Sequence, residues 1–362
     1  MNPQKRVIVA MSGGVDSSVV ALLLKEQGYE VTGVTMRIWD GDGPPEETGR
    51  HACYGPGEEE DIDDARRVAQ KLNIPFHVFD LRKDYRANVL DYTRQEYLSG
   101  KTPNPCIRCN RMVKLGGLLD QVRESGMVFD HVATGHYARI KYNRENERYL
   151  LMKARDLKKD QSYILYALSQ EQLGTCLLPL GEYIKEEVRR KAADAGLEVS
   201  EKTESQDFMA GGHHRLFEAA AHPGPVLDHR GITVGEHRGI PFYTIGQRRG
   251  LGIPWREPLY VIAIEPGSNA IIVGPKEKLY KSECTATALN WIATEVLNGP
   301  KKVKAKIRYS HAGAKAVITP LEENRVRIHF EEPQTAITPG QAVVFYDGDI
   351  VVGGGTIDKE SI

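Results

Sequence analysis

The sequence contains no apolar run that could cross a membrane. No stretch approaches the ~20 consecutive apolar residues that a membrane-spanning helix needs. Residues 1–6 lead directly into Val7-Ile8-Val9-Ala10, without the longer apolar segment of a signal peptide. We therefore expect a cytoplasmic protein that has no membrane partner.

Cysteine is scarce, and neither sign of charge is in excess. The 362 residues include five cysteines, and an odd number does not describe a disulfide framework. Reduced thiols in a cytosolic setting are the better interpretation. Lys and Arg total 48 against 49 Asp and Glu, a net charge of −1, which argues against a polybasic coat but permits a local basic face. The length allows two or three domains.

The first half of the chain alternates strand-like and helix-like segments. Such alternation predicts a parallel sheet with helices on both faces, a Rossmann-like α/β domain whose ligands bind at the carboxyl ends of the strands. Residues 41–60 have the acidic composition of a loop. The predicted strands are 6–10, 30–36, 76–79 and 130–135, and the predicted helices are 16–27, 61–72, 85–100 and 110–125.

The second half has a different character, which begins near the glycines at 211 and 212. From Pro225 onward, short β segments are separated by Gly and Pro, which favours a small barrel or sandwich. We expect three domains: a catalytic α/β domain at 1–212, a small central α/β domain at 213–280 and a C-terminal β-barrel at 281–362. The strands predicted are 260–264, 270–273, 303–309, 316–319, 325–330 and 342–346.

Residues 12–18, Ser-Gly-Gly-Val-Asp-Ser-Ser, lie between the first predicted strand and the first helix. Glycine lets backbone amides approach an anion, and a helix N-terminus adds the positive end of its dipole. Ser17 and Ser18 can donate hydrogen bonds, and Asp16 can help to hold Mg²⁺. The segment is neither a Walker A loop nor a dinucleotide fingerprint. A plain glycine turn with a serine cap is the alternative, but the composition and position favour nucleotide binding.

The segment 12–18 resembles the pyrophosphate-cleaving loop of the N-type ATP pyrophosphatases, which adenylate a substrate oxygen and release pyrophosphate. With six further motifs, the chain resembles the tRNA-specific 2-thiouridylases from Val7 to Gly355. The fold implied is an adenine nucleotide alpha hydrolase domain, a small central domain and a C-terminal barrel, the last two contacting tRNA. The motifs lie at 102–110 (TPNPCIRCN), 134–139 (TGHYAR), 159–163 (KDQSY), 244–250 (TIGQRRG), 308–309 (RY) and 339–341 (PGQ).

The resemblance implies ATP-dependent 2-thiolation of the wobble uridine, U34, in tRNA for Glu, Gln and Lys, with AMP and pyrophosphate released. It implies ATP and Mg²⁺ as cofactors, and tRNA and a sulfur donor (a cysteine desulfurase, a persulfide carrier or inorganic sulfide) as partners. Considered alone, His136 is as well explained by a core position, and Arg308-Tyr309 by a solvated strand face. The residues implied are Ala10, Met11, Ser12, Gly13, Gly14, Val15, Asp16, Ser17, Met36 and Gly135 for ATP; Asn104, Pro105 and Cys106 for the target base; and His136, Lys159, Asp160, Gln161, Arg308, Tyr309 and Gln341 for tRNA.

The cysteines depart from the better-known form of the family. That form has an Asp two residues after the Asn of the target-base motif, a nucleophilic cysteine three residues further, and a distal cysteine that receives a persulfide. Here Cys106 and Cys109 occupy the first two positions, and Met209 stands at the distal one. A thioether cannot carry a persulfide, so the usual two-cysteine relay cannot operate unchanged.

Two versions of sulfur delivery remain open, and both depend on Cys109. In one, Cys53, Cys106 and Cys109 ligate a [4Fe–4S] cluster whose open iron binds hydrosulfide. In the other, Cys109 is the nucleophile and Cys106 the sulfur carrier, and they finish as a disulfide. Arg108 and a helix N-terminus are expected to lower the pKa of either thiol. Cys176 and Cys284 are expected in the core.

Two other classes of function share parts of this pattern. An ATP-dependent ligase or amidotransferase could use the same loop with ammonia or an amino acid, although nothing resembles an amidotransferase partner domain. An RNA-binding protein that lost catalysis through Met209 is the other class.

Overall fold

The computed structural model describes residues 4–41, 52–202 and 207–359. Within these ranges the chain forms two compact units. The first comprises Met1–Val89, Cys106–His213 and Asp349–Val351, and the second comprises Leu90–Pro105, His214–Gly348 and Val352–Ile362.

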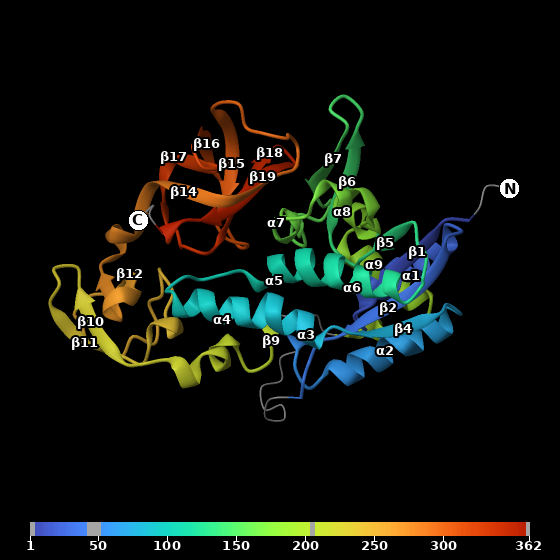
Figure 1. Cartoon of the computed structure of the whole chain (residues 1–362), viewed down its shortest axis with the longest axis horizontal. Helices are drawn as coiled ribbons and strands as arrows, with labels where there is room; N and C mark the ends of the chain where they lie inside the picture. Colours follow the sequence, from blue (N-terminus) through green and yellow to red (C-terminus); the bar gives the residue numbers. More distant parts are fainter. Residues whose placement is uncertain (1–3, 42–51, 203–206, 360–362) are drawn as a thin grey trace. The chain divides into compact units, whose positions relative to one another are not determined.

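A five-stranded parallel sheet of order β4-β2-β1-β5-β8 forms the centre of the first unit (Figure 1). From β1 the chain builds outward to β2 and β4, and it then returns to add β5 and β8 on the other side. The reversal places the topological switch point between β1 and β5, where ligands bind in open α/β sheets. The strands are β1 Arg6–Ala10, β2 Glu30–Arg37, β4 Phe76–Asp80, β5 His131–Ala133 and β8 Cys176–Leu177.

The central strand β1 is buried on both faces. Val7 and Val9 of β1 share one core with α1, α2 and α9, whereas Ile8 between them is equally buried and points to the other face. Burying one such side chain contributes roughly 1.5–3 kcal/mol. The helices are α1 Val15–Glu26, α2 Glu58–Lys71, α6 Leu118–Glu124 and α9 Lys185–Asp194, and α6 contacts β4.

Two helical stretches of the chain contain π-helical turns. The first runs through α3 Arg82–Tyr85 and a π-helical segment, Arg86–Leu90, into α4 Asp91–Leu98. The second begins with α5 Pro105–Arg108 and continues as a π-helical segment, Cys109–Gly117, into α6. π-Helical segments are rare in proteins, and those that occur often lie at functional sites. Smaller helices are α7 Ser162–Leu165 and α8 Gln170–Thr175, with single 3-10 turns at Pro179–Glu182 and Glu198–Glu201.

Two pairs of strands in the first unit were not predicted. β6 Ala138–Asn143 and β7 Arg148–Lys153 form an antiparallel hairpin. β3 Ala52–Tyr54 and β9 Asp207–Met209 form a short parallel pair. The part of the expected acidic loop 41–60 that is described therefore contains a strand and the start of α2, while residues 42–51 lie outside the described ranges.

The central part of the second unit is a four-stranded sheet of order β11-β10-β13-β12. Its described residues from 213 to 280 contain 3-10 turns but no α-helix, which differs from the expected α/β character. Tyr97 of α4 packs on Phe217 with ring centroids 5.3 Å apart, and Gly100 lies against Pro266, so residues 90–105 belong to this unit. The strands are β10 Gly224–Asp228, β11 Thr233–His237, β12 Tyr260–Glu265 and β13 Ala270–Gly274, and the turns are His213–Leu216, Glu218–Ala220, Ile240–Phe242, Pro266–Ser268 and Lys276–Leu279.

The C-terminal part closes into a barrel. Its six strands follow the order β14-β17-β16-β15-β18-β19, and β19 pairs again with β14. Alternate residues such as Ile318, Ile328 and Phe345 fill the interior and are at most 1% exposed. The strands are β14 Tyr280–Trp291, β15 Lys301–Lys306, β16 Ala314–Leu321, β17 Arg325–Thr335, β18 Ala342–Asp347 and β19 Ile350–Ile357.

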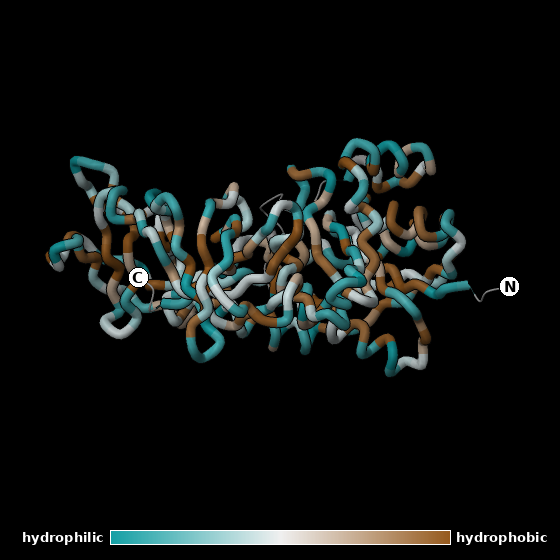
Figure 2. Tube along the Cα trace, turned by 90° about the horizontal axis from the view of Figure 1, so that it is seen from above, coloured by the Kyte–Doolittle hydropathy of each residue, from teal (hydrophilic) through white to brown (hydrophobic). Residues whose placement is uncertain are grey.

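Hydrophobic and hydrophilic residues are interleaved along the whole trace (Figure 2). Within the described ranges, no helix combines the length and the apolar character that crossing a membrane requires.

Candidate active site

The predicted phosphate loop, residues 12–18, follows the carboxyl end of β1. The Ser12 amide donates to Ser17 Oγ at 3.1 Å, and the hydroxyls of Ser17 and Ser18 donate to the Gly14 carbonyl at 3.2 and 2.9 Å. Helix α1 starts at Val15, and no side chain caps its first amides. Those amides and the dipole of α1 therefore remain available for an anion.

Glycine is required at position 13 of the phosphate loop. Its φ is +69°, and a Cβ there would lie 2.2 Å from the Asp61 carbonyl oxygen of α2. The phosphate loop thus rests directly on the backbone of α2. Beside it, Ala10 ends β1, Met11 is buried, and Met36 lies half-buried near the carboxyl end of β2.

A buried lysine holds the carboxylate of the phosphate loop. Lys185 Nζ lies 2.8 Å from both carboxylate oxygens of Asp16, and the Tyr137 hydroxyl donates to Asp16 Oδ1 at 2.7 Å. The Lys185 side chain is 8% exposed and that of Asp16 is 26% exposed. Lys185 also lies 5.7 Å from the centre of the Tyr137 ring. A positive charge is thereby fixed at the edge of the phosphate loop.

The loop after β5 touches the phosphate loop. A Cβ on Gly135 would lie 2.9 Å from the Ser17 amide nitrogen and 3.0 Å from Asp16 Cβ. His136 is buried, and its Nδ1 lies 2.7 Å from Thr134 Oγ1. Burial, and then Lys114, hold the pKa of His136 well below its usual value of 6.5, so its imidazole is neutral at neutral pH.

The segment 159–161 is tied into the same region. Gln161 Oε1 accepts from the Tyr137 amide at 2.9 Å, and the Gln161 amide donates to the Tyr137 carbonyl at 2.8 Å. Asp160 is buried and accepts from the Ala154 amide and the Ser162 hydroxyl, while Lys159 is half-buried. Asp160 and Gln161 thus have roles inside the protein, in addition to the tRNA contact predicted for them.

Three cysteines of the first unit lie close enough to the buried Tyr85 to raise its pKa. Cys53 is exposed, and Cys106 and Cys109 are partly buried one helical turn apart. Burial, followed by the thiols of Cys109, Cys53 and Cys106, raises the pKa of Tyr85 well above its usual value. The cysteines implied by the resemblance therefore share one neighbourhood, although Cys53 is about fifty residues from the other two in the sequence.

The expected activation of Cys109 by Arg108 was wrong. Burial raises the pKa of the Cys109 thiol to about 11, the Lys114 ammonium opposes this increase, and Cys53 adds to it. Arg108 instead directs its Nε to the Asn88 carbonyl at 2.8 Å. A thiol removed from water is harder to ionise than an exposed one.

The ammonium group of Lys114, which lowers the pKa of Cys109, also lowers the pKa of a residue beside the phosphate loop. Lys114 lowers the pKa of both Cys109 and His136, and His136 follows Gly135, which touches the phosphate loop. One lysine is therefore electrostatically coupled to both the thiol segment and the loop beside the predicted ATP site.

The distal sulfur position, Met209, lies on the strand that pairs with the strand of Cys53. In the β3–β9 pair, Tyr54 is the partner of Met209, and the Ala210 amide donates to the Tyr54 carbonyl at 2.9 Å. Cys53 precedes Tyr54, so its side chain points to the opposite face of the pair from Tyr54. The preceding residues Glu204–Gln206 lie outside the described ranges.

The described residues contain no group of three His, Cys, Asp or Glu side chains placed to hold a metal ion. The donor chemistry of three neighbouring thiols suits an iron–sulfur cluster, but as placed they do not form such a group. Cys176 and Cys284 are buried at 3% and 2% exposure, which confirms their predicted core positions.

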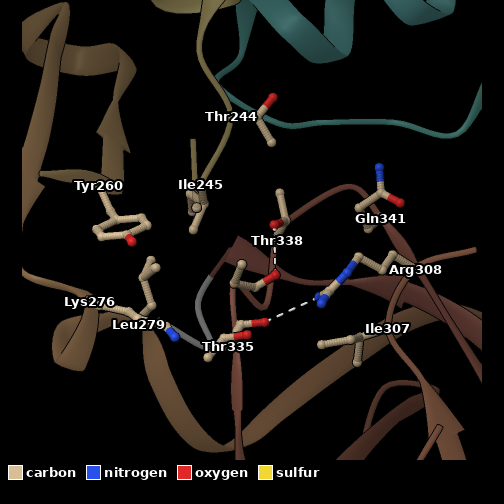
Figure 3. Close-up of a pocket in the computed structure, with 12 residues that line it drawn as sticks. Thr244, Ile245, Tyr260, Lys276, Leu279, Ile307, Arg308, Thr335, Thr338 and Gln341 are labelled. Atoms are coloured by element: carbon tan, nitrogen blue, oxygen red, sulfur yellow. Dashed lines mark hydrogen bonds between the residues drawn. The ribbon is translucent and has the colours of Figure 1, made fainter. Parts of the chain in front are cut away.

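The remaining predicted residues lie in the second unit. Gln341 Nε2 donates to the Thr102 carbonyl at 2.9 Å, immediately before Asn104 and Pro105. Arg308 Nη1 donates to the Thr335 carbonyl at 3.2 Å, and Tyr309 is 45% exposed. Arg308 and Gln341 line a cavity of about 420 Å³ (Figure 3), together with Thr244, Ile245, Gly246, Tyr260, Lys276, Leu279, Ile307, Thr335, Ala336 and Thr338.

Comparisons with known proteins extend over nearly the whole chain. The family model described as "tRNA methyl transferase HUP domain" matches residues 5–209, more than half of the sequence. A tRNA-specific 2-thiouridylase of Moorella thermoacetica is 51% identical over 359 residues, which cover 97% of this chain and 99% of that protein. The chain belongs to the tRNA-specific 2-thiouridylase family. Membership confirms the predicted family, the predicted fold class and the prediction that the chain is an enzyme.

Other matches support the same thiouridylase architecture. The descriptions "tRNA methyl transferase PRC-barrel domain" and "Aminomethyltransferase beta-barrel domain" match residues 216–275 and 281–357. A 2-thiouridylase of Desulforamulus reducens is 49% identical over 364 residues, covering 98% of each chain. The solved U34-tRNA thiolase NcsA of Methanococcus maripaludis shares 18% identity over 54% of this chain and 58% of its own, with a TM-score of 0.34, a likeness too distant to bear on the site.

Sequence reasoning missed Lys185, Lys114 and Tyr85. Lys185 had a signal, because a lysine at the first position of a helix opposes the helix dipole and so points to another reason for its presence. Lys114 and Tyr85 had none, since their importance comes only from what the fold brings beside them.

Proposed function

We propose that the chain catalyses the ATP-dependent 2-thiolation of the wobble uridine, U34, in tRNA. The observation that carries the proposal is the uncapped phosphate loop at the start of α1, which the loop that contains Gly135 touches. The Lys114 ammonium lowers the pKa of both Cys109 and His136, which supports adenylation and sulfur transfer in the same region. Family membership supports the use of ATP and the action on tRNA.

In the first half-reaction, O2 of the uridine attacks the α-phosphorus of ATP, and the bond to the β-phosphate breaks to release pyrophosphate. The amides of the phosphate loop and the start of α1 would stabilise the charge that develops on the phosphates. We assign ATP to Ala10–Ser17, Met36 and Gly135. Mg²⁺ would bind phosphate oxygens and the Asp16 carboxylate, the ligand type that it prefers, with Lys185 and Tyr137 holding that carboxylate in place.

In the second half-reaction, a sulfane sulfur on Cys106 attacks C2 of the adenylated base, and AMP leaves. Cys109 then attacks the Cys106 sulfur and breaks the S–S bond. The transferred sulfur stays on the base, and a Cys106–Cys109 disulfide remains. A thiol reductant must supply two electrons for the next cycle. Since Cys106 and Cys109 are one turn apart on the same helical segment, their sulfurs can approach one another.

The alternative sulfur source is an iron–sulfur cluster, which Cys53, Cys106 and Cys109 would hold and which would supply sulfur at the sulfide level. Neither half-reaction requires the cluster. Anaerobic purification followed by iron and sulfide analysis separates the two versions. Four irons and four sulfides per chain, lost together in Cys53→Ala, would support the cluster, and full activity of iron-free protein with a persulfide donor would exclude it.

We assign contacts with tRNA to six residues. Those in the first unit are His136, Lys159, Asp160 and Gln161, and those in the second unit are Arg308 and Tyr309. Arg suits phosphate contacts, and the exposed Tyr309 ring, which has Lys306 Nζ 5.8 Å from its centre, offers a stacking face. Asn104, Pro105 and Cys106 would contact the base, which must leave its stack to reach ATP.

The decisive variant is Cys109→Ala, compared with Cys284→Ala, whose thiol is buried in the barrel. We expect Cys109→Ala to abolish thiolation while the Kd for ATP and tRNA-dependent pyrophosphate release persist, because the phosphate loop is untouched. Cys284→Ala should retain thiolation. Pyrophosphate release that ignores tRNA, or a modified base whose mass shows nitrogen in place of sulfur, would refute the proposed function.

A further inference from the structure

The segment that leads into Cys106 is held by the C-terminal barrel. Residues 101–105, here called the target-base loop, contain the Asn104 and Pro105 assigned above to the base. The Thr102 amide donates to the Pro339 carbonyl at 2.9 Å. Gln341 Nε2 donates to the Thr102 carbonyl at 2.9 Å and lies 3.5 Å from the Pro103 carbonyl. Both backbone groups of Thr102 are thus bonded to one barrel turn, residues 338–341.

Glycine at position 340 is needed for this contact. Its φ is +87°, and a Cβ there would lie 2.9 Å from Lys101 Cβ and 3.0 Å from the Thr102 nitrogen. A side chain at 340 would therefore push directly on the target-base loop. Gly340 is buried, so the methyl group could not turn away into solvent.

The turn 338–341 is itself fixed to the barrel. The Gly340 amide donates to the Ile357 carbonyl at 3.0 Å, and the Ile357 amide donates to the Gln341 carbonyl at 2.8 Å. Ile357 ends β19 and is 1% exposed. The Gln341 side chain therefore projects from a supported backbone, which suits a side chain that positions another segment.

The target-base loop is also contacted from the central sheet region. Thr102 Oγ1 lies 3.4 Å from Thr244 Oγ1, and Thr102 is buried. Figure 3 shows Gln341 and Thr244, the two residues whose side chains contact Thr102, among the residues that line the cavity. The loop is thus bound between two parts of the second unit.

We propose that the barrel turn 338–341 is a clamp for the target-base loop, and that Gln341 is a positioning residue for thiolation. This proposal rests on the proposed function, since it assumes that Asn104 and Pro105 meet the base. Gln341 acts through the backbone of Thr102 and Pro103, which leads covalently to the base-binding residues and then to Cys106. Loss of the clamp should slow the reaction of bound tRNA while leaving its affinity nearly unchanged.

The test compares three variants of the full-length protein. Gln341→Ala removes the two donated contacts, and Gly340→Ala displaces the loop without removing any side chain that could touch RNA. Gly348→Ala is the control, because Gly348 also has a positive φ, +58°, but a Cβ there would meet no atom within 4 Å. We expect kcat for thiolation to fall on the order of 10- to 100-fold in the first two variants, the cost of misplacing reacting groups by about 1 Å. The Kd for tRNA should change by less than about twofold, and Gly348→Ala should match the parent.

A direct RNA contact by Gln341 gives a different pattern. Gln341→Ala would then weaken tRNA binding in proportion to its loss of activity, and Gly340→Ala would keep normal kcat, which would overturn the proposal. Hydrogen exchange in the absence of RNA and ATP provides a readout that does not require activity. Gln341→Ala and Gly340→Ala should accelerate exchange of the Thr102 amide, while Gly348→Ala should not. If the chain proved not to thiolate tRNA, faster exchange would still establish the clamp, and unchanged exchange would refute it.

Discussion

Burial and a nearby cation act in opposite directions on the Cys109 thiol. Burial has the larger effect and raises its pKa to about 11, and Lys114 limits the increase. Since the thiolate is the reactive form, the resting enzyme holds Cys109 mainly as a protonated thiol at neutral pH.

Alkylation of Cys109 should therefore depend on pH in a characteristic way. Below a pKa of about 11, each pH unit should raise the rate with iodoacetamide about tenfold, so the rate should climb from pH 7 to 10 without a plateau. Lys114→Gln removes the favourable charge and should slow alkylation at every pH in this range, whereas Lys114→Arg should not. Mass spectrometry of the Cys109 peptide gives the rates. A plateau at or below pH 9 would contradict this account.

The phosphate loop and α2 are in direct backbone contact. Gly13 meets the backbone of Asp61, so the path of the loop depends on where α2 lies. α2 in turn reaches the end of β2, because the Glu58 carboxylate accepts from the amides of Ile38 and Trp39 at 2.7 and 3.0 Å. The loop is consequently shaped by a helix to which no ATP contact is assigned.

Gly13→Ala should weaken ATP binding while the fold persists. The added methyl would overlap the Asp61 carbonyl, and the positive φ adds strain of about 1–3 kcal/mol. We expect the Kd for ATP to rise at least about tenfold, measured by calorimetry, which corresponds to ~1.4 kcal/mol. Gly28→Ala is the matched control, since Gly28 has a φ of +84° and a Cβ there would meet no atom within 4 Å. The stability of this variant should fall, but its Kd for ATP should not change. If both variants lost ATP affinity equally, the loss would come from lower stability of the fold and not from the phosphate loop.

Local pattern predicted some elements better than others. β1, the phosphate loop and α1 were found within one or two residues because strand, glycine turn and amphipathic helix follow directly in the sequence. The β3–β9 pair could not be predicted, since it joins two three-residue strands more than 150 positions apart. The raised pKa of Cys109 was missed for the same reason, because burial depends on tertiary contacts that no local spacing encodes.

The protein as a whole is nearly neutral, although its tRNA substrate is a polyanion. A net charge of −1 gives no general attraction to RNA, so binding must come from a few local contacts. Arg308, which lines the cavity of the second unit, is one such candidate. The family resemblance identified Arg308, but the sequence alone did not indicate that its guanidinium would be held by the Thr335 carbonyl.

Arg308→Ala should reduce the salt dependence of tRNA binding. Loss of one phosphate contact to a single-stranded segment should lower the slope of log Kd against log [KCl] by roughly 0.7. Filter binding between 50 and 300 mM KCl would measure this, and Arg308→Lys should keep the parental slope because the charge remains. Parallel lines for Arg308→Ala and the parent would show that Arg308 touches no phosphate.

The division of the chain into units has a practical consequence for protein engineering. Residues 90–105 belong with the second unit, although they lie between two stretches of the first. A chimera that exchanges only the C-terminal half between two relatives would pair a foreign barrel with a native 90–105 segment. A functional transplant should therefore carry both stretches, so that Thr102 keeps its contact with Gln341.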